Sequence, residues 1–157
     1  MGSLDLLDLK ILLKLSENSR KSFAQIAREL GVGESTVYLR VKKLFDQGVL
    51  KGFTVDVDYN MLGFGAEVFI ELKPIPRSVK YVVNELIKIP NVLELYEVSG
   101  NYSLLVKVIA RNNEELSAVI DKISSLGDIL DLNVRYVFKS YIKKGISKEF
   151  EVISSTD

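Results

Sequence analysis

Apolar residues recur at the spacing of α-helices in three stretches of the first fifty residues. The first stretch predicts an amphipathic helix that ends near residues 16–18. Its apolar positions are Leu4, Leu7, Ile11 and Leu15. The other two stretches predict helices over residues 23–30 and from about residue 34 to residue 46. Ser22, with a glutamine three residues later, has the spacing of a capping box at the start of the second helix. The short glycine-containing connection between the second and third helices is typical of a helix-turn-helix.

The pattern changes after the third helix. Apolar and polar residues alternate over residues 53–59, which predicts a half-buried strand at the exit of the first domain. The alternating apolar positions are Phe53, Val55 and Val57. Residues 53–65 as a whole are therefore predicted to link residues 1–52 to a second domain.

Residues 66–140 contain an internal repeat with an offset of 37 residues, and each copy has the order strand, helix, strand. The predicted strands cover residues 66–73, 92–95, 103–110 and 129–132, and residues 135–141 also have a strand pattern. Two such units in series give the β-α-β-β-α-β order of the ferredoxin-like arrangement. The sequence thus predicts a second domain over residues 66–144, with two helices on one face of a four-stranded sheet, and a tail over residues 145–157.

The predicted strands carry apolar residues on both faces. Residues 104–109 are apolar except for Lys107, and residues 136–141 include three aromatic side chains. A sheet that is apolar on both faces needs a covering layer on both faces. We expect the face that the helices leave open, or an edge of the sheet, to pair with a second subunit. The alternative is that the tail over residues 145–157 covers it.

Composition narrows the possible chemistry. The chain has no Cys and no His, which excludes disulfides, thiolate metal sites, a catalytic cysteine and the Ser–His class of nucleophilic site. No metal-ligand spacing and no glycine-rich phosphate loop is present either. We therefore expect no catalytic residues, no metal and no enzymatic activity. No targeting segment and no run of about 20 apolar residues is visible, so the expected location is the cytoplasm.

The charge distribution favours one anion-binding region. The net charge is zero, but residues 20–51 contain seven Lys or Arg and only three Asp or Glu. A basic patch on a neutral chain is typical of a surface that binds an anion. In a helix-turn-helix the second helix lies in the major groove of DNA, with its first residues at the base edges. The alternative is a basic, solvated helix in a plain bundle.

The predicted third helix supplies most of the candidate DNA contacts. Its exposed positions are Glu34, Ser35, Tyr38, Leu39, Lys42 and Lys43. Ser35 and Tyr38 can reach bases, and the basic side chains suit phosphates or guanine edges. The full set of candidate DNA-binding residues is Arg20, Lys21, Glu34, Ser35, Thr36, Tyr38, Arg40, Lys42, Lys43 and Lys51.

These segments resemble the Lrp/AsnC family, the leucine-responsive or "feast/famine" transcription regulators. The opening helix is similar in LDLLDLKILLKLSENSRKS, and the recognition segment and linker strand are similar in IARELGVGESTVYLRVKKLFDQGVLKGFTVDVDYNMLG. The resemblance covers about residues 4–144. The Thr36–Val37 pair and Arg40 match the family, whereas Gly33 stands where the family usually has Ser. The resemblance implies an N-terminal helix-turn-helix and a C-terminal ferredoxin-like domain that binds ligands and oligomerises.

The resemblance also implies an effector loop. The family typically has Thr-Gly-Asp-Tyr-Asp before an apolar strand, and the matching segment here is Ser99-Gly100-Asn101-Tyr102-Ser103. The candidate effector-binding residues are Tyr96, Ser99, Gly100, Asn101, Tyr102, Ser103, Leu104, Asp131 and Asn133. Both loop aspartates are replaced by neutral residues. Either the ligand differs from an α-amino acid, or a nearby Glu94, Glu97 or Asp131 balances its ammonium group, or there is no effector.

In total, the sequence predicts an α+β protein with an N-terminal winged helix-turn-helix domain and a C-terminal ferredoxin-like βαββαβ domain. The expected function is sequence-specific transcriptional regulation through double-stranded DNA. The expected assembly is a homodimer that could build a tetramer or octamer, and the expected small molecule is an amino-acid-like effector, with no cofactor and no membrane partner. The alternative is an architectural DNA-binding protein that works without a ligand.

Overall fold

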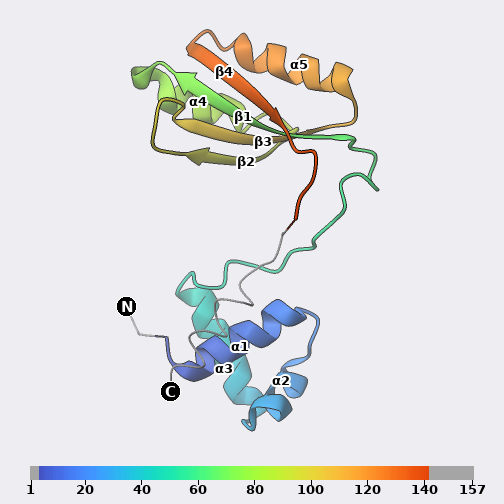
Figure 1. The fold of residues 1–157 in the computed structure, drawn as a ribbon. Helices are drawn as coiled ribbons and strands as arrows, with labels where there is room; N and C mark the ends of the chain where they lie inside the picture. The colour runs from blue at the N-terminus through green and yellow to red at the C-terminus, as the bar shows by residue number, and fades with distance from the viewer. Residues whose placement is uncertain (1–3, 142–157) are drawn as a thin grey trace. The chain divides into compact units, whose positions relative to one another are not determined.

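The computed structural model describes residues 4–141, which divide into two compact units. The first unit contains the described residues up to Val55, and the second contains residues 56–140 (Figure 1). The division after Val55 falls inside the segment predicted to be the linker.

Three helices make up the first unit, and their ends follow the caps that the sequence contains. They are α1 (Leu6–Glu17), α2 (Phe23–Leu30) and α3 (Glu34–Asp46). Ser22 and Gln25 form the predicted capping box at the start of α2. Gly31 ends that helix in the left-handed conformation, with φ of 68°, which an L side chain rarely adopts. All three predicted helices are confirmed, and so is the tight turn between α2 and α3.

The hydrophobic core of the first unit is small. One cluster joins all three helices through Ile11, Leu15, Ile26, Ala27, Val37 and Val41. Helix α1 thus packs on the α2–α3 pair. The opposite side of α3 is left for solvent.

The predicted strand over residues 53–59 is wrong for the single chain. The structure has no strand between residues 4 and 65. The side chains of Phe53 and Val55 are 51% and 79% exposed. A strand is stable only when its backbone groups pair with a neighbour, and these residues have no neighbouring strand in one copy of the chain.

The second unit has the predicted ferredoxin-like order. Its elements are β1 (Ala66–Pro74), the short 3-10 helix η1 (Pro76–Ser78), α4 (Val79–Leu86), β2 (Val92–Glu97), β3 (Leu104–Ala110), α5 (Asn113–Ser124) and β4 (Ile129–Tyr136). The antiparallel sheet has the order β2-β3-β1-β4. The two central strands are therefore the first strands of β1-α4-β2 and β3-α5-β4, as the internal repeat requires.

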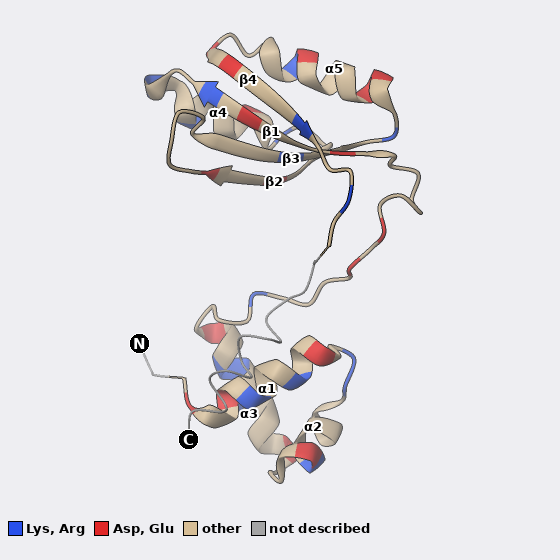
Figure 2. Cartoon of the chain, viewed as in Figure 1, with Lys and Arg blue, Asp and Glu red and all other residues tan. Residues whose placement is uncertain are grey.

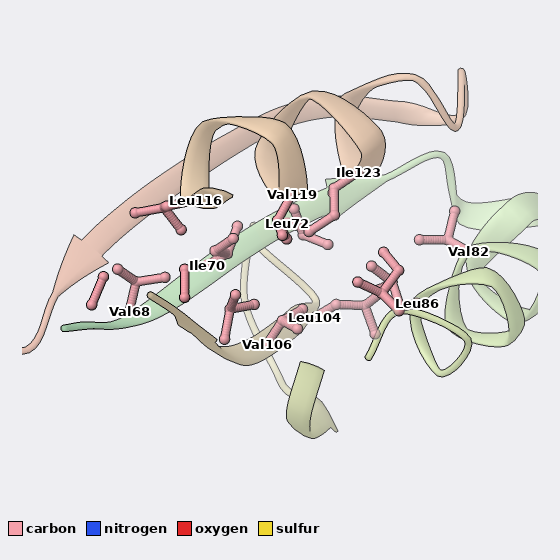
Figure 3. Close-up of a cluster of buried hydrophobic side chains, with 14 residues drawn as sticks. Val68, Ile70, Leu72, Val82, Leu86, Leu104, Val106, Leu116, Val119 and Ile123 are labelled. Atoms are coloured by element: carbon pink, nitrogen blue, oxygen red, sulfur yellow. The ribbon is translucent and has the colours of Figure 1, made fainter. Parts of the chain in front are cut away.

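One face of this sheet carries the hydrophobic core. Alternate residues of β1 and β3 point to it, and residues of α4 and α5 complete the same cluster, so both helices cover that face. Figure 3 shows Leu116, Val119 and Ile123 of α5 near Ile70 and Leu72 of β1. This apolar layer explains why the helical repeats of the sequence have matching spacings.

The other face of the sheet is more polar than the sequence suggests. Phe69 and Leu105 are only partly exposed there, but the Lys107 ammonium lies 3.2 Å from Glu67 and 3.4 Å from Glu94. Arg135 binds Glu71 at 2.9 Å on the same face. The expectation of a sheet that is apolar on both faces is therefore wrong for β1 and β4.

The last strand is shorter than expected. Strand β4 ends at Tyr136, and the side chain of Phe138 is 97% exposed. The N–H of Val137 still donates to the carbonyl of Glu67 at 2.9 Å. Because β1 begins at Ala66, the chain beyond that bond has no strand beside it. Within residues 4–141, no helix is both long enough and apolar enough to span a membrane.

Candidate functional site

Helix α3 presents a continuous exposed surface that begins in its first turn. Gly33 caps the helix with its backbone, and the side chains of Ser35, Tyr38, Leu39 and Lys42 all point to solvent. Their spacing of three and four residues places them on one side of the helix. We call these four residues the outer face of α3.

The outer face includes an aromatic side chain with a fixed neighbour. The Tyr38 ring meets the Phe23 ring of α2 edge to face, with 6.3 Å between ring centroids. Phe23 itself packs against the core of the first unit. Tyr38 is therefore held in place at its base while 55% of its surface stays exposed.

The opposite edge of α3 is tied to the start of α1 by charges. Asp8 has no exposed surface, yet it sits among ionic partners: Lys43 Nζ donates to Oδ2 at 2.8 Å, and Arg40 Nη1 donates to Oδ1 at 3.2 Å. Arg40 also donates to Asp5, the N-cap of α1. We call Asp5, Asp8, Arg40 and Lys43 the α1–α3 ion cluster. Figure 2 shows acidic and basic positions of the two helices in this part of the fold.

The ion cluster keeps its carboxylates charged. Burial alone raises the pKa of Asp8, but hydrogen bonds from Lys43, from the Asp5 backbone and from Arg40 outweigh this effect, so the pKa lies below its usual value. The pKa of Asp5 is also lowered, first by the backbone N–H of Asp8 and then by Arg40. A buried carboxylate is tolerated only when charged or polar groups satisfy it, and Asp8 meets that condition.

The structure separates the ten candidate DNA-binding residues into groups. Ser35, Tyr38 and Lys42 lie on the outer face of α3, with Glu34 exposed beside them. Arg40 and Lys43 instead belong to the ion cluster. The remaining members lie elsewhere: Arg20 and Lys51 are exposed, Thr36 is half-buried, and Lys21 binds Glu29 at 2.9 Å.

Sequence reasoning did not anticipate the ion cluster. The signal was present, because Asp5 and Asp8 have the same three-residue spacing as Arg40 and Lys43. Two acidic positions on one helix edge can therefore face two basic positions on another. Nothing in the periodicity alone shows that the two edges meet.

The candidate effector residues occupy the β2–β3 connection and the neighbouring open face. Gly100 turns the loop with φ of 112°, and the N–H of Val98 donates to the carbonyl of Ser103 at 2.9 Å. Ser99 and Asn101 are exposed. The loop is therefore a closed turn with accessible polar groups.

Hydrogen bonds connect some of the candidate effector residues to strands β4 and β1. Tyr102 Oη donates to Asp131 Oδ2 at 2.6 Å, and that hydrogen bond is the main cause of the raised pKa of Tyr102. Asn133 Nδ2 donates to Glu71 at 3.4 Å, next to the Glu71–Arg135 pair. The structure thus joins the loop to β4 through a tyrosine and a carboxylate.

Two other candidate residues are not part of this group. The Leu104 side chain is completely buried in the core of the second unit. Tyr96 is exposed and donates to Glu94, which raises the pKa of the tyrosine. Residues 4–141 contain no cluster of three or more acidic side chains placed to hold a metal ion.

Comparison with known families accounts for most of the chain. Residues 4–44 match the AsnC-type helix-turn-helix domain, and residues 67–146 match the Lrp/AsnC ligand binding domain. The HTH-type transcriptional regulator FL11 of Pyrococcus furiosus is 33% identical over 138 residues, which cover 88% of this chain and 91% of the relative. A further HTH-type transcriptional regulator, from Methanocaldococcus jannaschii, is 35% identical over 139 residues, covering 88% of this chain and 94% of that protein.

Solved structures of similar fold agree with these family matches. AsnC of Escherichia coli superposes with a TM-score of 0.87 at 29% identity, over 93% of this chain and 99% of that one. A transcriptional regulator of Neisseria meningitidis, solved as a complex with L-Met, has the same fold, with a TM-score of 0.84 at 21% identity over 94% of this chain and 99% of that one. The fold, the two matched domains and the identities to the archaeal relatives lead to one conclusion: this chain belongs to the Lrp/AsnC family of transcriptional regulators, with a DNA-binding helix-turn-helix domain and a C-terminal ligand-binding domain.

Proposed function

We propose that this protein regulates transcription by binding specific DNA sequences as an oligomer, under the control of a small amino-acid-like effector. The observation that carries the proposal is the outer face of α3, which a helix-turn-helix presents to solvent with Ser35, Tyr38 and Lys42 ready to contact DNA. These residues follow directly on the N-terminus of α3, where helices of this motif meet base edges.

Self-association is supported by the need for two half-sites and by the open face of the sheet. A single short helix contacts few base pairs, and two helices related by a two-fold axis would read two half-sites a whole number of helical turns apart. Phe69 and Leu105 provide apolar surface at the centre of the open face, and the charged pairs around them can give the contact a defined register. The smallest assembly that meets these needs is a homodimer.

Effector binding is supported by the loop between β2 and β3. Asp131 lies beside this loop through its bond to Tyr102, so a carboxylate is available to balance a ligand's ammonium group although Asn101 and Ser103 are neutral. The structural neighbour solved with L-Met shows that this fold can hold an amino acid. We therefore place the effector at Ser99–Ser103 and Asp131, and we assign no cofactor and no catalytic step to the chain.

A footprinting experiment tests the proposal. The full-length chain is mixed with genomic fragments in excess competitor DNA, and protected segments are mapped by nuclease cleavage. We expect a few protected sites that contain two half-sites of one sequence. The control is the Lys42→Ala variant, which should protect the same sites only at higher concentration.

Protection spread evenly along all fragments would overturn sequence-specific recognition and would support the architectural alternative. In that alternative, many copies bind through phosphates and DNA deformability. The absence of charge at Asn101 and Ser103 favours it, because a chain without an effector needs no charged loop. A regulator of either kind acts at the chromosome, so we expect the protein in the cytoplasm.

A further inference from the structure

The outer face of α3 has a large apolar side chain at its centre. Leu39 is 62% exposed and lies between Ser35 and Lys42, one position after Tyr38. A leucine at this site buries little within its own chain. If the helix enters a major groove, the same side chain becomes one of its most protruding groups.

The outer face of α3 contains no arginine side chain. Arginine contacts guanine more often than any other side chain does in the major groove. Arg40 is the single arginine of α3, and it donates to Asp5 and Asp8 on the edge that faces α1. Of the cations on α3, Lys42 lies on the outer face, whereas Lys43 donates to Asp8.

The major groove offers one apolar group to a protein, the 5-methyl group of thymine. A leucine gains free energy from burial against a methyl group and gains nothing from the polar edges of the other bases. Tyr38, the residue before Leu39, is held by its edge-to-face contact with the Phe23 ring. Leu39 therefore lies beside an aromatic side chain of restricted movement.

We propose that Leu39 is a specificity-determining residue, and that it selects a thymine in each half-site by packing on the 5-methyl group. This inference rests on the proposed DNA-binding function. It adds the chemical feature of the DNA that the outer face of α3 recognises.

The experiment combines a change in the protein with the removal of one methyl group from the DNA. A duplex that the full-length chain enriches from a randomised library is resynthesised with deoxyuridine in place of each thymidine in turn. Deoxyuridine keeps every hydrogen-bonding group of thymidine and lacks the methyl group. Dissociation constants are measured at one salt concentration for the wild type and for Leu39→Ala, Leu39→Met and Leu62→Ala.

For the wild-type chain we expect one thymine position in each half-site at which deoxyuridine weakens binding about fourfold, the effect of losing one buried methyl group. Leu39→Ala should bind the two duplexes equally. Leu39→Met keeps an apolar side chain of similar volume and should retain most of the difference. Leu62→Ala is the matched control, because Leu62 is 60% exposed and lies outside the first unit, and it should keep the wild-type ratio.

Two results would overturn the inference while leaving DNA binding intact. One is a duplex in which no thymine is sensitive to loss of its methyl group. The other is a sensitive thymine whose fourfold effect persists unchanged in Leu39→Ala, since another side chain then contacts the methyl group. Failure of the wild-type chain to enrich any duplex would instead refute the proposed function itself.

Discussion

Asp8 is a fully buried carboxylate in a domain with a small core, and its charged partners offset the free-energy cost of its burial. Lys43 and Arg40 bind its two oxygens, and Asp5 shares Arg40. A buried ion cluster gives little more stability than well-packed apolar side chains would give in its place. Loss of one member is nevertheless destabilising, because it leaves the remaining charges unpaired. The importance of Asp8 is thus in holding α3 against α1.

The first prediction concerns this residue. Asp8→Ala should lower the free energy of unfolding by about 2 kcal/mol, because it removes hydrogen bonds to charged groups and leaves two cations side by side. The loss of unfolding free energy stays moderate, because the side chains of Arg40 and Lys43 are each about one-third exposed and water can hydrate their charges. Urea unfolding followed by circular dichroism measures the change. Asp46→Ala removes an exposed carboxylate from the same unit and is the control; an equal loss in both variants would contradict the prediction.

The second prediction is a pH dependence at the same residue. The pKa of Asp8 in the folded chain lies below its usual value of 3.8. The folded state therefore binds this proton more weakly than the unfolded state does. The stability that Asp8 contributes is complete above about pH 4 and is lost as the pH falls through the folded pKa. Unfolding free energies measured from pH 6 down to pH 2 should show a smaller acid-induced loss in Asp8→Ala than in the wild type, and parallel curves would refute this assignment.

Helix α3 has two sides with different roles. One side faces the rest of the first unit through the ion cluster and the core residues Val37 and Val41. The other side is the exposed outer face, formed by Ser35, Tyr38, Leu39 and Lys42. The basic residues of this helix therefore do not act together. We therefore expect removal of Arg40 or Lys43 to destabilise the first unit, and removal of Lys42 to change only its surface.

The third prediction separates these two effects. Lys42→Ala should weaken binding to duplex DNA and lower the slope of log affinity against log salt by about 1, the effect of one lost phosphate contact, with the unfolding midpoint unchanged. Arg40→Ala should also lower the unfolding midpoint, because Asp5 and Asp8 lose a partner. Salt titrations of DNA affinity and urea unfolding of both variants provide the measurements. An unchanged midpoint in Arg40→Ala would show that the ion cluster does not support the helix.

Sequence pattern predicts elements well where the signal is local. The start of α2 at Ser22 and its end at Gly31 follow from side chains within four residues, and the repeat of the second unit follows from matching spacings. The segment over residues 53–59 has an equally clear alternation and forms no strand, because a strand depends on a partner that alternation does not provide. The ion cluster and the charged open face of the sheet depend on contacts between distant residues, so periodicity could not reveal them.

At the scale of the whole molecule, the open face of the sheet is the surface to which we assign the proposed self-association. The apolar side chains of Phe69 and Leu105 lie among the Lys107 and Arg135 ion pairs. In the β1–β3 ladder, Leu105 pairs directly with Glu71. A new negative charge at residue 105 would therefore face an existing one.

The fourth prediction follows from this placement. Leu105→Glu should reduce the molar mass in solution towards the 17.6 kDa of one chain, because the charge must be buried next to Glu71 when two copies meet. Light scattering, with and without a panel of amino acids, measures the mass. Ser117→Glu, on the exposed side of α5, is the control and should keep the wild-type mass. A wild-type mass of 17.6 kDa under all conditions would refute assembly through any surface.

The two sides of α3 also determine how such a protein can diversify. Substitutions at exposed positions usually change stability by less than about 0.5 kcal/mol, so the four residues of the outer face can be exchanged at little cost to the fold. Substitutions in the ion cluster must compensate one another across two helices. Among descendants of one ancestral gene, we therefore expect the preferred operator to drift freely while the charges at positions 5, 8, 40 and 43 change only in concert. The same separation gives a protein engineer four positions at which to retarget this domain to new promoters.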